Sequence, residues 1–323
     1  MISQRLISAV ALCAFTAAAP AAAQETLTAP GPQGDLAGTL IAPQEGRPLV
    51  LIIPGSGPTD RDGNSPMGVA AAPYRLLAEG LANRGIGTLR IDKRGMFGSA
   101  KATADANAVT ISDYVADTAA WVDAARQATG RECIWLLGHS EGGLVALASA
   151  VHTQNLCGLV LVAVPGRTFG TVLREQLHSN PANGPLLADA DSAITALEGG
   201  ERIDVSSFHP ALQQLFAPAI QGFLIDLLAH DPAQLAASID LPVLVVQGGE
   251  DLQVSKADAA ALTAANPDFR YLEIPAMNHV LKSVPQGDVA ANRASYGDPS
   301  LPLAEELVDG IAEFISELGA SEQ

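Results

Sequence analysis

Residues 134–142 read IWLLGHSEG, and this stretch decides the fold. The apolar run 134–137 leads into the pattern Gly-x-Ser-x-Gly centred on Ser140, and a stretch rich in alanine and leucine follows. A short apolar run that ends at glycine is typical of a strand buried on both faces. The stretch therefore predicts a buried strand, a sharp turn at Ser140 and a helix, in that order.

The two glycines of the pattern have a steric reason. A serine on so sharp a turn has strained backbone angles, and the flanking chains approach too closely for side chains two positions away. Gly138 and Gly142 remove those clashes. The turn also places the Ser140 hydroxyl at the start of a helix, where positive partial charge favours a developing anion. In a chain with 30 glycines the bare pattern is weak, so its strand–turn–helix context carries the prediction that Ser140 is a nucleophile.

Strands and helices alternate on both sides of this stretch. Such alternation predicts right-handed crossovers, hence an α/β fold with a mostly parallel sheet covered by helices on both faces. Ligands of such sheets bind beyond the carboxyl ends of the strands. We predict an antiparallel pair within 26–43, strands at 48–53, 87–91, 133–137, 159–164, 242–246 and 269–274, and helices at 73–84, 111–128, 142–151, 255–265 and 303–318.

The interval 166–240 breaks the alternation. Its apolar pieces have helical spacing and are separated by prolines, which favours a helical cap inserted over the strand ends. The alternative is that the interval hides one more strand–helix unit of the sheet. The predicted core then consists of residues 24–165 and 241–323.

The first residues have the pattern of a signal peptide, which we assign to 1–23. Arg5 precedes an apolar run, 6–19, and Ala21-Ala22-Ala23 fits the small-residue cleavage rule. The run is shorter than the roughly 20 residues that a membrane span needs, so a stable membrane anchor is the less favoured alternative. We expect export to the periplasm or secretion.

Charge and composition exclude several classes of function. Apolar residues make up 48% of the chain and charged residues 16%, so a sizeable core is expected. The formal net charge of −17 repels nucleic acid and anionic lipid. No cluster of residues has a metal-ligand spacing, so we expect neither a metal nor another cofactor. The oligomeric state does not follow from the sequence.

Two cysteines, Cys133 and Cys157, remain after the predicted cleavage. An even number in an exported chain favours a disulfide. Each cysteine lies near the start of one of two strands predicted to be neighbours, which brings them within reach. The alternative is a pair of buried free thiols.

A nucleophilic serine needs a base and a group that orients it. Only one histidine lies beyond residue 230, His279, and it follows the last predicted strand. Asp251 follows the strand at 242–246 and is the predicted orienting acid, with Glu250 as its competitor; the spacing from Gly248 favours Asp251. His139, beside the nucleophile, is interpreted as a packing residue.

A negative oxygen that develops at the site needs two N–H donors. One is predicted to be the amide of Glu141, the residue after the nucleophile. The other is predicted to be the amide of Ser56 in the glycine-rich loop 54–58, although that loop has the alternative of being a mere tight turn. Two charged clusters, 59–62 and 92–94, either line the mouth of the site or form internal ion pairs that hold the loops.

Together these motifs resemble the α/β-hydrolase superfamily, in particular its serine aminopeptidase-like and monoacylglycerol-lipase-like branch. The likeness lies in 54–58, 92–99, 138–142, 248–251 and 278–279, and it covers nearly the whole mature chain outside the insertion. The resemblance implies an eight-stranded sheet, a variable cap and acyl transfer through Ser140. One departure is Pro54, which stands where many relatives have histidine beside the glycine of the oxyanion loop.

Within that resemblance, a small-molecule carboxylic ester is the expected substrate, and the shape of the cap is expected to decide the acyl chain length. A peptidase acting on N-terminal residues is the main rival, and it would need an acid such as Glu201, Asp204 or Asp226 to bind an ammonium group. A thioesterase, an acyltransferase and a non-catalytic binding protein on the same scaffold are further alternatives.

Overall fold

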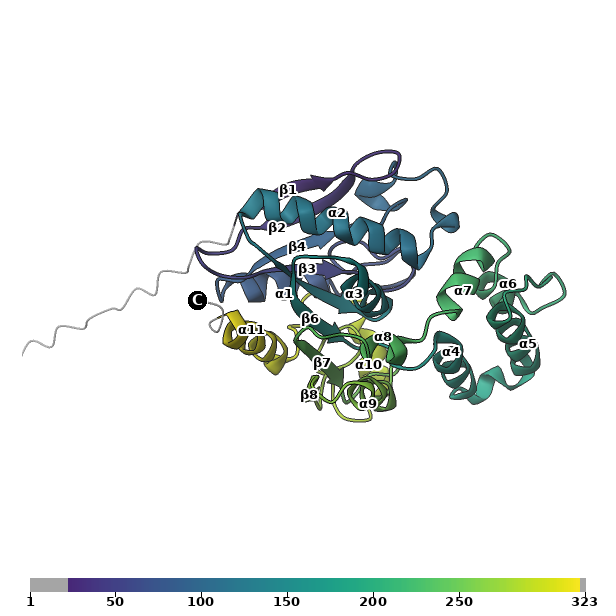
Figure 1. Cartoon of the computed structure of the whole chain (residues 1–323). Coiled ribbons are helices and arrows are strands. Elements are labelled where there is room, and N and C mark those ends of the chain that lie inside the picture. The colour runs from purple at the N-terminus through teal and green to yellow at the C-terminus, as the bar shows by residue number, and fades with distance from the viewer. Residues whose placement is uncertain (1–22, 320–323) are drawn as a thin grey trace, which may run out of the picture.

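The computed structural model describes residues 23–319 (Figure 1), so the predicted signal peptide, apart from Ala23, lies outside the described residues. Its centre is one eight-stranded sheet with the strand order β1-β2-β4-β3-β5-β6-β7-β8. The pairs β1·β2 and β2·β4 are antiparallel, and all other neighbours are parallel. The strands are β1 (Gln24–Ala29), β2 (Leu36–Ile41), β3 (Leu49–Ile53), β4 (Gly87–Ile91), β5 (Ile134–His139), β6 (Leu156–Val162), β7 (Val243–Gly248) and β8 (Arg270–Ile274).

The predicted α/β fold with a mostly parallel sheet is confirmed, as is the antiparallel pair at its edge. Strand and helix ends shift by a few residues, and two short helices, α8 (Pro232–Ala236) and α10 (Val289–Ser295), were not predicted. The α-helices are α1 (Pro73–Ala82), α2 (Ile111–Thr129), α3 (Glu141–His152), α4 (Phe169–His178), α5 (Leu187–Glu198), α6 (Pro210–Leu215), α7 (Gln221–Leu228), α8 (Pro232–Ala236), α9 (Lys256–Ala265), α10 (Val289–Ser295) and α11 (Glu305–Gly319), and the 3₁₀ helices are η1 (Phe97–Ser99), η2 (Ala106–Ala108) and η3 (Pro181–Leu186). Within residues 23–319 no helix has both the length and the apolarity to cross a bilayer.

Helices cover both faces of the sheet because its central strands are apolar at every position. In β3, Leu49, Leu51 and Ile53 point into the core beneath α2, α3, α8 and α9. Val50 and Ile52 point into the opposite core, beneath α1 and α11. A strand with alternating polar residues would have left one face in water; this continuous run needs a cover on each.

The topology determines where a site can form. After β3 the chain crosses to β4 on one side, and it later places β5 on the other side of β3. At such a switch point the connections diverge and leave a crevice at the carboxyl ends of the strands. The loop after β3 and the turn after β5 therefore open into the same space.

The interval 166–240 consists of helices joined by turns and loops, without a strand. Helices α4, α5, α6 and α7 enclose a hydrophobic cluster of their own and stand at one side of the sheet (Figure 1). Helix α8, inside the same interval, instead contacts α3 and α9. It covers the sheet on the crossover from β6 to β7, so we describe only α4–α7 as the cap.

Cys133 and Cys157 form a disulfide. Cys133 immediately precedes β5 and Cys157 lies at the start of β6, its parallel neighbour. The predicted pairing is thus present, and the bond closes the end of the sheet opposite to the crevice.

Candidate active site

The turn after β5 has the strained geometry that its sequence predicts. Ser140 adopts φ 55° and ψ −124°, a left-handed conformation that costs a residue with a Cβ on the order of 1–3 kcal/mol. A Cβ at Gly138 would lie 2.3 Å from the carbonyl oxygen of Gly142, and one at Gly142 would lie 2.3 Å from that of Ile53. Neither position can hold a side chain, so both glycines are required for the turn.

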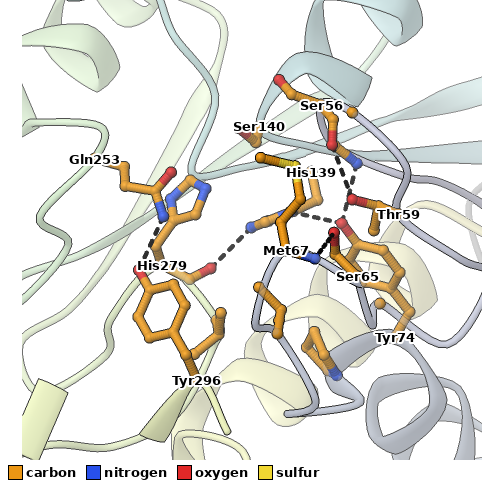
Figure 2. A pocket seen from close by; sticks show the side chains of 16 residues that line it. Ser56, Thr59, Ser65, Met67, Tyr74, His139, Ser140, Gln253, His279 and Tyr296 are labelled. Carbon is orange, nitrogen blue, oxygen red and sulfur yellow. Dashed lines mark hydrogen bonds between the residues drawn. The ribbon is translucent and has the colours of Figure 1, made fainter. Parts of the chain in front are cut away.

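Ser140 opens into a cavity of about 310 Å³, shown in Figure 2. His139 and His279 line the same cavity. The rest of its wall comes from the loop 55–73, from Tyr74, and from Gln253, Val280 and Tyr296. Of the described residues that line it, none is an aspartate, glutamate, lysine or arginine, so the wall has no carboxylate, ammonium or guanidinium group.

Asp251 and His279 are joined by a hydrogen bond, with 2.8 Å between Oδ2 and Nδ1. The Asp251 side chain is fully buried, and its other oxygen accepts the amides of Gln253 and Val254 at 2.8 and 3.0 Å. This carboxylate is therefore held on three sides. Glu250, its competitor in the sequence, instead accepts the amide of Gly287.

The acid and base loops meet because glycines allow their backbones to touch. A Cβ at Gly248 would lie 2.2 Å from the carbonyl of Met277, and one at Gly249 would lie 2.3 Å from that of Pro275. The buried Asn278 side chain donates to Ser295 Oγ at 2.7 Å and accepts the amide of Lys282 at 3.0 Å. These contacts hold the turn that presents His279.

The loop after β3 lies against the nucleophile. A Cβ at Gly55 would lie 3.3 Å from the Cβ of Ser140. Both backbone groups of Gly55 are engaged: its amide donates to Tyr74 Oη at 3.1 Å, and its carbonyl accepts from Lys93 Nζ at 2.7 Å. Ser56 is exposed, and within the described chain its amide donates no hydrogen bond. Its amide is therefore available as a donor, as is the amide of Gly57, for which the described chain offers no acceptor either.

Glu141 begins α3, where the first amides of a helix have no partner within it. Its side chain is buried and lies 3.5 Å from Lys93 Nζ. Burial lowers the pKa of Lys93, and Glu141 counters that effect. The carboxylate therefore serves as the partner of a buried lysine, while the backbone amide of Glu141 remains at the elbow beside Ser140.

The charged clusters of the two loops form internal ion pairs. Arg61 binds Asp92 through Nε at 3.0 Å, and Arg94 binds Asp117 through two bonds of 2.6 Å. Arg90 pairs with Asp62. Of the two alternatives for these clusters, the structure has the ion pairs that hold loops.

Three buried residues make contacts at the site that the sequence did not predict, although His139 was interpreted as a packing residue and Lys93 as part of a charged cluster. Tyr74 and His139 hydrogen-bond to each other at 2.8 Å, and His139 Nε2 contacts the carbonyl of His279 at 2.9 Å (Figure 2). Lys93 is the third. The available signal was chemical, since a histidine beside the nucleophile and a lysine just after a buried strand both need partners when they are buried.

The sequence is similar to those of known hydrolases. Residues 67–167 match the family model described as "Serine aminopeptidase, S33". Esterase EstD of Thermotoga maritima is 28% identical over 215 residues, 65% of this chain. The chain spans about half the length of that relative, 48%.

Solved structures share the whole fold. Est1E from Butyrivibrio proteoclasticus superposes with a TM-score of 0.58 at 18% identity, over 91% of this chain and 99% of that one. DcsB, solved in complex with its substrate analogue, superposes with a TM-score of 0.60 at 19% identity, over 92% and 100%. The chain therefore has an α/β-hydrolase fold, and in sequence it is similar to serine aminopeptidase-like and esterase-type proteins.

Proposed function

We propose that the protein is a serine hydrolase that cleaves small-molecule carboxylic esters through an acyl-enzyme on Ser140. His279 acts as the base and Asp251 as the group that orients and stabilises it. The amides of Ser56 and Glu141 receive the oxyanion.

One observation carries the proposal. An imidazole bound through Nδ1 to a buried carboxylate shares a cavity with a serine held in a strained turn. Because Nδ1 carries the proton donated to Asp251, Nε2 is left with a lone pair. That is the tautomer a general base needs.

In the first half-reaction, Ser140 Oγ attacks the acyl carbon while its proton passes to His279 Nε2. The carbonyl oxygen becomes negative and is bound by the two amides, each of which contributes about 3 kcal/mol in known cases. The imidazolium then returns the proton to the departing alcohol oxygen. The ester bond breaks, and the acyl group remains on Ser140.

In the second half-reaction, the oxygen of a water molecule bonds to the acyl carbon while the water gives a proton to His279 Nε2. The second tetrahedral intermediate then collapses: the bond to Ser140 Oγ breaks, His279 returns the proton to Oγ, and the carboxylic acid leaves. The same residues would serve a thioester, and an alcohol in place of water would make the reaction an acyl transfer.

The uncharged cavity wall supports an ester over an aminopeptidase substrate. A substrate ammonium group needs a carboxylate, and none is among the described lining residues. Of the cap acids considered for that role, Asp226 accepts the amide of Ile111 at 2.7 Å and Asp204 accepts that of Ser206 at 2.9 Å.

The test compares p-nitrophenyl acetate, p-nitrophenyl octanoate and aminoacyl-nitroanilides on the same enzyme, with fluorophosphonate labelling of Ser140 as the measure of an active nucleophile. We expect labelling and ester turnover well above anilide turnover. Faster anilide turnover would make the protein a peptidase, and a folded protein that is not labelled would support the binding-protein alternative.

We also propose that the chain is exported and loses residues 1–23. The disulfide supports this, because such bonds persist in oxidising compartments. Sequencing the N-terminus of protein recovered from the periplasm or the medium should begin at Gln24. Recovery of the uncleaved chain from the cytoplasm alone would contradict the proposal.

A further inference from the structure

A continuous chain of hydrogen bonds runs from the loop after β3 to the loop of the base. The amide of Gly55 donates to Tyr74 Oη, the Tyr74 hydroxyl meets His139 Nδ1, and His139 Nε2 meets the carbonyl of His279. These bonds connect three segments that lie far apart in sequence: the oxyanion loop at Gly55, His139 beside the nucleophile, and the loop that carries the base His279. Figure 2 shows the two His139 contacts side by side with Ser140.

The groups at the two ends of this series of hydrogen bonds determine which atom donates and which accepts in each bond. A carbonyl oxygen only accepts, so His139 Nε2 carries a hydrogen and donates it to His279. A neutral imidazole then accepts at Nδ1, so the Tyr74 hydroxyl donates there. The same hydroxyl oxygen accepts the amide of Gly55. All donors and acceptors are satisfied with both side chains uncharged.

Because both side chains are buried, water cannot readily take the place of a lost hydrogen-bond partner. Tyr74 is 2% exposed and His139 is 5% exposed. Burial and the neighbouring His279 imidazole lower the pKa of His139 to about 3, and burial raises the pKa of Tyr74. Where water has little access, loss of one member leaves its neighbour without a partner, and the loop attached to that neighbour is free to shift.

Lys93 secures the same loop through the next peptide unit, which joins Gly55 to Ser56. It donates to the carbonyl of Gly55 at 2.7 Å, while Tyr74 receives the amide. With both groups of Gly55 held, the peptide that follows it cannot rotate freely. That peptide carries the Ser56 amide, the proposed oxyanion donor.

We propose that Tyr74 and His139 are positioning residues that hold the oxyanion loop and the His279 loop at a set distance on either side of Ser140. The inference rests on the proposed function for its catalytic meaning. Neither side chain exchanges a proton with substrate. Their effect is geometric, and small misplacements of reacting groups cost on the order of 100-fold in rate.

The first test is Tyr74→Phe, which keeps the aromatic wall of the cavity and removes only the hydroxyl. We expect kcat for p-nitrophenyl acetate to fall about 10- to 100-fold with KM changed less than about threefold. Tyr114→Phe is the matched control, because Tyr114 is a buried tyrosine outside this chain of bonds. It should retain kcat within about twofold.

The second test compares His139→Leu with His139→Gln. Leucine fills the space and removes both hydrogen bonds, whereas glutamine keeps a donor in reach of the His279 carbonyl and an acceptor for Tyr74. We expect the glutamine variant to recover a large part of the activity that the leucine variant loses. If His139→Leu does not fold, the activities of Tyr74→Phe and His139→Gln test the positioning role instead.

The rate of Ser140 labelling by a fluorophosphonate is measured in parallel, since it needs no ester substrate. Slower labelling in Tyr74→Phe, at unchanged melting temperature, supports the inference even if no ester is turned over, in which case the ester proposal alone fails. Tyr74→Phe with kcat and labelling within about twofold of wild type overturns the inference while ester hydrolysis stands. A wild-type protein that is not labelled overturns both.

Discussion

At the scale of single residues, Ser140 has a strained backbone and lines the same cavity as His279. His279 is hydrogen-bonded to the buried carboxylate of Asp251. Neither feature is needed for packing. Strain that persists at a concave site, beside an oriented imidazole, is characteristic of groups positioned for reaction.

Replacing the nucleophile or the base should remove nearly all ester turnover. In Ser140→Ala and His279→Ala we expect kcat to fall by about 10⁴-fold or more with folding intact, because attack and proton transfer both fail. Asp251→Asn should lose a comparable amount or less. Steady-state kinetics with circular dichroism check this; full-rate hydrolysis by Ser140→Ala would mean that another nucleophile is at work.

His139 should make the protein sensitive to acid. Its folded-state pKa of about 3 lies below the ordinary histidine value, so the folded protein keeps it neutral while the unfolded chain takes a proton below about pH 6.5. Stability from this residue is therefore lost as pH falls from about 6.5 toward 3, at up to about 1.4 kcal/mol per pH unit.

Urea unfolding of wild type and His139→Gln at several pH values measures this slope. The variant should lose less free energy of unfolding between pH 6.5 and 4 than wild type does. His152→Gln, at an exposed position on α3, is the control and should follow wild type. Parallel curves for His139→Gln and wild type would contradict the prediction.

At the scale of elements, the loop between β3 and α1 supplies half of the described residues that line the cavity, and none of them belongs to α4–α8. The expectation that the cap decides acyl chain length therefore needs correction. The cap buries its apolar side chains in its own cluster, which leaves the loop 55–73 to shape the cavity. Internal ion pairs such as Arg61–Asp92 hold that loop in place.

Met67 should consequently influence selectivity for acyl length. It lines the cavity yet is 72% exposed, so a larger side chain there can be accommodated without disturbing the core. We expect Met67→Trp to lower kcat/KM for p-nitrophenyl octanoate several-fold more than for the acetate. Val289→Trp, at an exposed position off the cavity, should leave the ratio unchanged. If Met67→Trp lowered kcat/KM equally for both esters, the loop would not determine selectivity for acyl chain length.

At the scale of the whole molecule, two hydrophobic cores and one disulfide hold the sheet, and the site lies at the opposite end of the strands from that bond. The disulfide joins neighbouring strands across a sequence separation of 24 residues. In the chain-entropy picture, a loop of this length corresponds to about 3 kcal/mol of stabilisation through the unfolded state.

Removing the bond should therefore lower stability without removing activity. We expect the double variant Cys133→Ser, Cys157→Ser to lose about 3 kcal/mol in the free energy of unfolding while kcat of the folded enzyme stays near wild type. Reductant should destabilise wild type and leave the double variant unaffected. A large loss of kcat in the folded variant would show that the bond also shapes the site.

Much of this protein was predictable because local patterns determine it. Apolar runs predict strands buried on both faces, helical spacing predicts the covering helices, and Gly138 with Gly142 predicts the turn at Ser140. The alternation of these elements then predicts the parallel sheet. All of these depend on residues close together in the chain, where backbone sterics and burial act locally.

The rest was decided by tertiary structure. The link from Tyr74 through His139 to the carbonyl of His279, the engagement of both backbone groups of Gly55 and the uncharged cavity wall join segments that are far apart in sequence. A sequence shows that a histidine or a lysine needs a partner when it is buried. Which partner it meets depends on how the loops at the ends of the strands pack, and only the folded chain determines that.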